Sequence, residues 1–216
     1  DLFRDAFLFG KEPNENAKKY LAQEHYVYLA YFSPNIIKVG TSSLERKEIR
    51  PIEQDALIYA YIAKSDGFNI QKLEHEISKR FNITESVSSR HKVKYLFQKP
   101  IIENAKFKIT NLFNKITDYY KDTEYKTWFL KELNIINHSD KPYIKYPETL
   151  DDFIYSAEFL CGKFVGLRGK ILIVENYGNI IGIYKDNIIG HFIEGDSNEK
   201  YLPVKEQNNL QQPLFK

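Results

Sequence analysis

The feature that most constrains the fold is residues 25–33, a segment in which both faces are apolar when it is drawn as an extended strand. Alternate side chains of a strand point to opposite faces. One face carries Tyr26, Tyr28, Ala30 and Phe32, and the other carries Val27, Leu29 and Tyr31. Such a strand has to be covered on both sides, as in the middle of a layered domain. The pattern therefore predicts a buried strand with packed layers on either side of it.

Two more strands are predicted after this segment. A turn signal at residues 33–35 separates it from an apolar run at residues 36–40, so a hairpin is the simplest prediction. Residues 57–63 carry a similar apolar pattern and predict a third strand. Between the second and third strands, residues 43–56 are predicted to be helical, with an interruption at the proline within them.

Helical periodicity marks three other segments. Residues 14–23 predict a short helix capped by Asn14. Apolar residues spaced three or four positions apart predict a second helix over residues 70–81. Residues 101–136 predict a long helical stretch with a break near Asp122.

From Tyr143 onward the pattern changes to short strands separated by turn residues. These strands are predicted at residues 171–175, 180–184 and 188–193. The predicted fold class is therefore α+β: a small mixed β-sheet with flanking helices, a long helical segment, and a small C-terminal antiparallel β unit.

A run of polar and turn-forming residues at 137–142 is the best domain boundary. We expect four regions along the chain: an N-terminal extension at residues 1–24, a sheet-containing domain at 25–97, the helical segment at 98–137, and the C-terminal β unit with its tail at 138–216.

The composition narrows the classes of function. The net charge of +2 over 216 residues gives no global basic field, so any surface that binds nucleic acid has to be a local patch. The single cysteine, Cys161, excludes an internal disulfide framework and a cysteine-rich zinc site, and it suits a reducing compartment. With no signal peptide and no apolar run of about 20 residues, we expect a cytoplasmic protein with no membrane partner.

Glu74 is the most informative position for chemistry. At about 100° per residue, the apolar residues of the second predicted helix form one stripe, and Glu74 falls roughly 55° from its centre. A carboxylate at the buried edge of a helix requires a cation, a metal ion or hydrogen-bond donors. A single glutamate suffices for Mg²⁺, which keeps several of its waters. The alternative is a purely structural ion pair with Arg50, Lys38 or Arg80.

Two arginines follow the second predicted strand. A guanidinium can bind a phosphate through two parallel hydrogen bonds and can offset charge that develops in a transition state. Arg50 directly precedes Pro51, which restricts the backbone of Arg50 and so can hold it steady. Arg46 lies among the charged residues 45–48, where either a nucleic-acid contact or a solvated surface position fits the pattern.

Tyr28 and Lys38 lie on the two strands of the predicted hairpin. A tyrosine hydroxyl can accept a proton from attacking water if a nearby cation lowers its pKa; the alternative for Tyr28 is a core position. Gly40 fits a close approach of the backbone or a tight strand end. Thr41 is predicted to cap the helix that follows.

Positive charge is also concentrated in residues 88–94. Arg90, His91, Lys92 and Lys94 are suited to contacts with nucleic-acid phosphates, and a solvated surface loop is the alternative.

The first two predicted strands resemble those of the GIY-YIG nuclease superfamily. Val27 and Tyr28 stand where the second and third letters of the GIY motif fall, and residues 39–40 stand where the last two letters of YIG fall. Tyr26 replaces the glycine of the first motif, and Lys38 replaces the tyrosine of the second. In the same comparison, Arg50 resembles the superfamily's helix arginine and Glu74 its metal-binding glutamate.

More narrowly, the chain is similar to an uncharacterised family whose members carry VYLA, then KVG, then an arginine followed by a Gln-Gly-Ala element. The corresponding residues here are 27–30, 38–40 and 50–56. Residues 144–147 and 166–173 resemble two further pieces of that family, IxYP and GxxGxxLI.

The resemblance implies hydrolysis of nucleic-acid phosphodiester bonds that depends on a divalent metal, Mg²⁺ or Mn²⁺. Glu74 would hold the metal and Arg50 the scissile phosphate, while Tyr28 would act as general base or position the water, with Lys38 assisting. Two alternatives stay open: a catalytically inactive protein that binds nucleic acid such as structured RNA, and a protein-interaction module on the same scaffold. DNA and RNA are equally compatible with the sequence.

Overall fold

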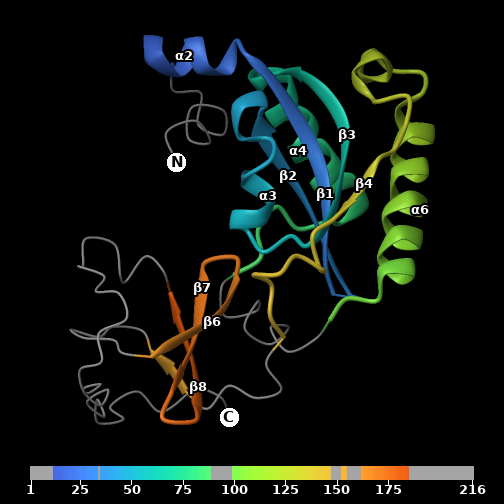
Figure 1. Ribbon diagram of the computed structural model, residues 1–216. Helices are drawn as coiled ribbons and strands as arrows, with labels where there is room; N and C mark the ends of the chain where they lie inside the picture. The colour runs from blue at the N-terminus through green and yellow to red at the C-terminus, as the bar shows by residue number, and fades with distance from the viewer. Residues whose placement is uncertain (1–11, 34, 89–98, 147–151, 155–161, 185–216) are drawn as a thin grey trace, which may run out of the picture. The chain divides into compact units, whose positions relative to one another are not determined.

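A computed structural model describes residues 12–33, 35–88, 99–146, 152–154 and 162–184. The chain divides into two compact units, residues 1–146 and residues 147–216 (Figure 1). The predicted α+β class is confirmed, because helices and antiparallel sheets occur together. The division falls after Tyr146, whereas the sequence placed a boundary within residues 137–142.

The first unit is built on a four-stranded sheet of order β2-β1-β3-β4, in which neighbouring strands pair antiparallel. Its strands are β1 (Glu24–Ser33), β2 (Ile36–Ser43), β3 (Ile58–Asp66) and β4 (Ile135–Asn137). The predicted hairpin is confirmed as β1 and β2, with Tyr28 opposite Gly40 and Ala30 opposite Lys38. At the outer edge of β2, a parallel bridge joins Lys38 to Thr84.

The helices of this unit are α2 (Glu15–Leu21), η1 (Leu44–Arg46), α3 (Arg50–Glu53), α4 (Gly67–Phe81), α6 (Ile102–Tyr120) and η2 (Glu124–Trp128). The predicted cap of α2 is confirmed, and α4 has caps at both ends. The Asn14 side chain accepts a hydrogen bond from the Ala17 amide at 2.8 Å, as expected for the N-cap of α2. α4 begins after the N-cap Asp66 and ends at Asn82, which has φ of 51° in the left-handed region.

Three local predictions were wrong. Pro51 does not interrupt a helix over residues 43–56 but lies in the first turn of α3, which follows the separate short helix η1. The predicted break near Asp122 is confirmed, since α6 ends at Tyr120, but the chain does not resume a helix as far as Ile136, because residues 135–137 pair with β3 as the strand β4. Two of the residues in β4 are isoleucines, and β-branched side chains are better accommodated in a strand than in a helix. Pairing with β3 therefore outweighs continuation of the helix. Thr41 does not cap a helix, because β2 continues through Ser43 and Thr41 pairs with Val27.

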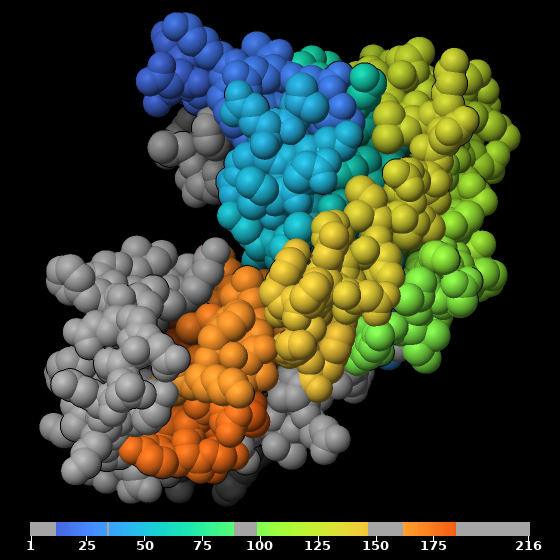
Figure 2. All heavy atoms as spheres, in the orientation of Figure 1, coloured from blue at the N-terminus to red at the C-terminus, as the bar shows by residue number. Residues whose placement is uncertain are grey.

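The strand β1 is covered on both sides, as its sequence predicted. We call the side packed against α4 and α6 the helix face; from β1 it includes Val27, Leu29 and Tyr31. We call the opposite side the tyrosine face; its buried members are Tyr26, Tyr28, Ala30, Ala56, Tyr59 and Tyr61. Figure 2 shows the short helices around α3, in cyan, and the chain around β4, in yellow, at the surface of this unit.

The second unit contains a sheet of order β5-β8-β7-β6. Its strands are β5 (Asp152–Ile154), β6 (Lys163–Arg168), β7 (Ile171–Asn176) and β8 (Asn179–Tyr184). The strands predicted at residues 171–175 and 180–184 are confirmed as the antiparallel pair β7 and β8, whereas β6, which pairs antiparallel with β7, and β5, which pairs parallel with β8, were not predicted. The strand predicted at residues 188–193 lies outside the described residues. None of the helices that the structure describes has the length and apolarity needed to cross a bilayer.

Candidate functional site

Tyr28 is at the centre of the candidate site. It lies on β1 in the tyrosine face, where only 1% of its surface is exposed. Its hydroxyl donates a hydrogen bond to Oε1 of Gln54 at 3.0 Å. A Cβ atom at the opposite residue, Gly40, would lie 2.5 Å from Cζ of Tyr28 and 2.6 Å from its hydroxyl oxygen. Gly40 is therefore the close approach that the sequence suggested, and it makes room for the phenol ring.

Lys38 joins the same hydrogen-bonded group from β2. Its side chain shares a face with that of Tyr28, because Lys38 is opposite Ala30 and Gly40 is opposite Tyr28. Lys38 is buried, and its ammonium donates to Oε1 of Gln54, the same oxygen that accepts from Tyr28. The structure thus brings together the two hairpin residues that the sequence singled out, through a glutamine that follows α3.

Arg50 begins α3 and is half-buried. Pro51 occupies the first turn of this helix, where backbone N–H groups have no partner within the helix, so the N–H that proline lacks costs no helical hydrogen bond. Gln54 follows this four-residue helix directly, so the side chains of Arg50 and Gln54 come from the same short segment of chain.

Glu74 comes from α4, the helix on the opposite face of the sheet. It is half-buried and follows Leu73, which is fully buried in the helix-face core. This intermediate position agrees with its place at the edge of the apolar stripe.

The charges of Arg50 and Glu74 both influence the pKa of Tyr28. Burial raises the pKa of the Tyr28 phenol, the Arg50 guanidinium acts to lower that pKa, and the Glu74 carboxylate acts to raise it. Two opposite charges, contributed by α3 and α4, therefore act on a phenol of β1. The four residues proposed from the sequence belong to four different elements: hydrogen bonds join Tyr28 and Lys38 through Gln54, whereas Glu74 comes from the helix on the other face of the sheet.

The net effect on Tyr28 bears on its chemical role. Burial is the largest influence and keeps the pKa of the phenol above its ordinary value. A general base near neutral pH needs a pKa lowered toward that pH. In this structure, Tyr28 is a neutral hydrogen-bond donor, and the property expected of a base is missing.

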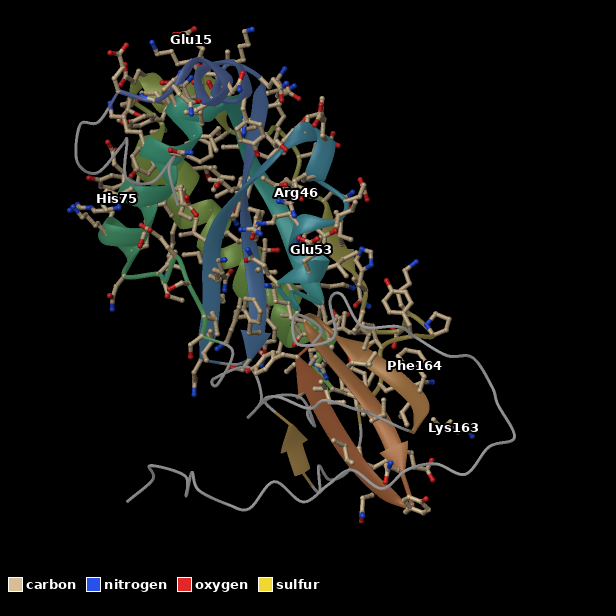
Figure 3. The ribbon with its side chains drawn as sticks, turned by 90° about the vertical axis from the view of Figure 1, so that its left-hand side faces the viewer. Glu15, Arg46, Glu53, His75, Lys163 and Phe164 are labelled. Atoms are coloured by element: carbon tan, nitrogen blue, oxygen red, sulfur yellow. The ribbon has the colours of Figure 1, made fainter. Side chains whose placement is uncertain are left out.

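Of the remaining sequence candidates, the structure describes Arg46 alone. Arg46 forms an ion pair with Glu53 at 2.6 Å between Nη2 and Oε2, with 48% of the Arg46 side chain exposed. Figure 3 shows this pair on the side away from His75 of α4. The basic candidates Arg90, His91, Lys92 and Lys94 lie outside the described residues.

The side chains suited to metal binding are sparse around Glu74. Within the described ranges, no group of three or more histidine, cysteine, aspartate or glutamate residues could hold a metal ion. A divalent ion at Glu74 would therefore take most of its ligands from water or from a phosphate, a pattern that Mg²⁺ tolerates.

Sequence reasoning did not assign a role to Gln54. Its partners are 26 and 16 residues away along the chain, so no local pattern connects them. The one available signal was the resemblance, because Gln54 matches the glutamine of the family element that follows the arginine.

The comparisons with known proteins give one family. A family described as protein of unknown function, DUF2797, matches residues 7–187 of the 216. No curated protein and no solved structure matches the chain.

Proposed function

We propose that this chain, which belongs to the family described as protein of unknown function (DUF2797), hydrolyses phosphodiester bonds of nucleic acid with the help of a divalent metal. One observation carries the proposal: Tyr28 and Lys38 share the Gln54 oxygen, and the charges of Arg50 and Glu74 both act on the Tyr28 phenol. A cationic side chain, a carboxylate and a hydroxyl are the groups that phosphoryl chemistry requires. The resemblance to the GIY-YIG superfamily points the same way.

Glu74 is the residue that would hold Mg²⁺ or Mn²⁺. Its carboxylate is half-buried on a rigid 15-residue helix, which fits an ion that needs one or two protein carboxylates. A bound divalent cation would stabilise negative charge on the phosphate and would lower the pKa of a water bound to it, so that the proton of the attacking water is lost to solvent before attack.

The other residues act on the phosphate and on the attacking water. The Arg50 guanidinium binds the scissile phosphate and offsets its developing charge. The Lys38 ammonium adds a second positive charge. Tyr28 positions the attacking water by accepting a hydrogen bond on its hydroxyl oxygen, because its single proton is donated to Gln54 and its raised pKa is unsuited to proton abstraction.

The test compares Glu74→Gln with Glu76→Gln on the same helix. Glu76 is a matched control because its Oε1 accepts a hydrogen bond from the Tyr125 hydroxyl at 2.7 Å, a bond that glutamine can still accept. Fluorescent single- and double-stranded DNA and RNA are incubated with Mg²⁺ or Mn²⁺. We expect Glu74→Gln to lower metal-stimulated cleavage by about a hundredfold or more while Glu76→Gln cleaves as the unmodified chain does. Cleavage by Glu74→Gln at the unmodified rate would contradict the proposal.

A nucleic-acid-binding protein without cleavage is the second candidate. The buried, neutral phenol of Tyr28 favours it, because that phenol lacks the pKa of a base. If the unmodified chain cuts no substrate with any divalent ion but binds nucleic acid with a steep salt dependence, this candidate replaces the first. A protein that binds neither DNA nor RNA would contradict both.

A further inference from the structure

The turn after α3 holds Gln54 in a defined place. Three backbone hydrogen bonds close this turn. The backbone N–H groups of Gln54 and Ala56 both donate to the Pro51 carbonyl, at 3.1 and 2.9 Å. The backbone N–H of Asp55 donates to the Ile52 carbonyl at 2.8 Å. Asp55 has φ of 63°, a left-handed conformation that favours glycine and that aspartate tolerates better than most residues.

The side chain of Gln54 is fixed by two donors from different strands. Its Oε1 accepts from the Tyr28 hydroxyl of β1 and from the Lys38 ammonium of β2. A carbonyl oxygen has two lone pairs, so these two bonds occupy both of them. They also fix the amide orientation, since the amino group of Gln54 cannot replace the oxygen as an acceptor.

Gln54 also connects the hairpin to the cation of α3. Arg50 is four residues earlier in the same hydrogen-bonded segment, so any shift of this segment moves both side chains. The Gln54 amide is uncharged, so it orients the Lys38 ammonium without neutralising the charge of that group.

We propose that Gln54 is a positioning residue of the candidate site, which holds the Lys38 ammonium so that its remaining N–H groups can donate to a bound phosphate, and which fixes the rotation of the Tyr28 hydroxyl. The inference rests on the proposed function, because the phosphate is the ligand toward which these groups are oriented. Gln54 acts through Lys38 and Tyr28.

Two variants separate positioning from simple stability. Gln54→Leu removes the shared acceptor at similar volume, and Gln54→Glu keeps the acceptor but adds a negative charge beside Lys38. Gln23→Leu is the control, because Gln23 is exposed in the turn before β1. For cleavage of the best substrate from the panel above, we expect both Gln54 variants to lower kcat about tenfold to a hundredfold per folded molecule. The Glu variant should also change the pH profile, because its carboxylate neutralises the ammonium.

A second measurement does not depend on activity. With EDTA present, binding of the same fluorescent nucleic acid should weaken several-fold for Gln54→Leu, because the Lys38 ammonium is no longer held toward the phosphate, while the control variant should bind as the unmodified chain does. Unchanged binding by Gln54→Leu would contradict the positioning role.

The outcomes distinguish the two proposals. If the unmodified chain cleaves and both Gln54 variants keep its kcat and pH profile, the positioning role is overturned and the proposed function stands. A loss of activity that only follows the loss of folded protein also overturns the role. If the unmodified chain cleaves nothing, the proposed function falls, and the positioning role falls with it.

Discussion

The two faces of the first sheet are made by the same strands but differ in chemistry. The helix face is packed with fully buried apolar side chains, among them Val27, Leu29, Ile62 and Leu73. On the tyrosine face, the buried rings end in hydroxyl groups that each have a partner. Tyr26 bonds to Glu24, Tyr28 to Gln54, Tyr59 to His138, and Tyr61 to the carbonyl of Lys47.

The helix face therefore contributes mainly to stability, and the tyrosine face contributes the polar groups available for chemistry. Burial of apolar area is non-directional, so the helix face stabilises the fold without requiring particular partners. Each buried hydroxyl, in contrast, needs a specific acceptor or donor and therefore fixes the position of another polar group. The candidate site lies where one such hydroxyl, that of Tyr28, meets side chains from β2 and α3.

The largest expected effect is on the helix face. Leu29→Ala removes a fully buried side chain, so we expect a loss of about 2–5 kcal/mol in the free energy of unfolding, measured by urea denaturation. Leu44→Ala is the control; Leu44 is 52% exposed, and its truncation should change stability by less than about 0.5 kcal/mol. Similar losses in the two variants would contradict the assignment of the core to this face.

An intermediate effect is expected where the tyrosine face is most crowded. Gly40→Ala places a methyl group against the Tyr28 ring, so we expect a loss of about 1–3 kcal/mol in the same measurement. In a Tyr28→Ala background the methyl group has space, and the added substitution should cost less than about 1 kcal/mol. Equal costs in the two backgrounds would show that Gly40 is not required for the ring.

The smallest effect is a dependence on alkaline pH. Burial raises the pKa of Tyr59 to about 12, above its unfolded value of about 10. The folded state therefore binds more protons than the unfolded state above pH of about 10, and stability falls as pH rises from there toward about 12. Tyr59→Phe should weaken this decline, as measured by urea midpoints across that range. If the stability of Tyr59→Phe declines as steeply as that of the unmodified chain, groups other than Tyr59 cause the pH dependence.

Local patterns predicted much of the scaffold. The period of two in residues 25–33 identified a strand covered on both faces, and the apolar spacing over residues 70–81 identified α4, which begins at Gly67. The same spacing placed Glu74 at the edge of the buried stripe, where it is half-buried. These features depend on neighbours within a few residues, and for that reason they can be read from the sequence.

Other features depend on distant partners. The residues of β4 pair with β3 although about 70 residues separate them, so pairing overrides their local helical pattern. The raised pKa of Tyr28 also comes from its surroundings, because burial outweighs the Arg50 charge that acts to lower it. No single-sequence pattern reports which of these influences is larger.

The amino-acid sequence by itself determined the strands β1, β2, β3, β7 and β8, the Asn14 cap of α2, and the set of polar residues available for a site. Only the tertiary structure decided that one glutamine oxygen serves both Tyr28 and Lys38, and that charges from α3 and α4 act on one phenol. The reason is physical: secondary structure follows from backbone geometry and short-range periodicity, whereas a hydrogen bond or a pKa depends on atoms that folding brings within a few ångströms of each other.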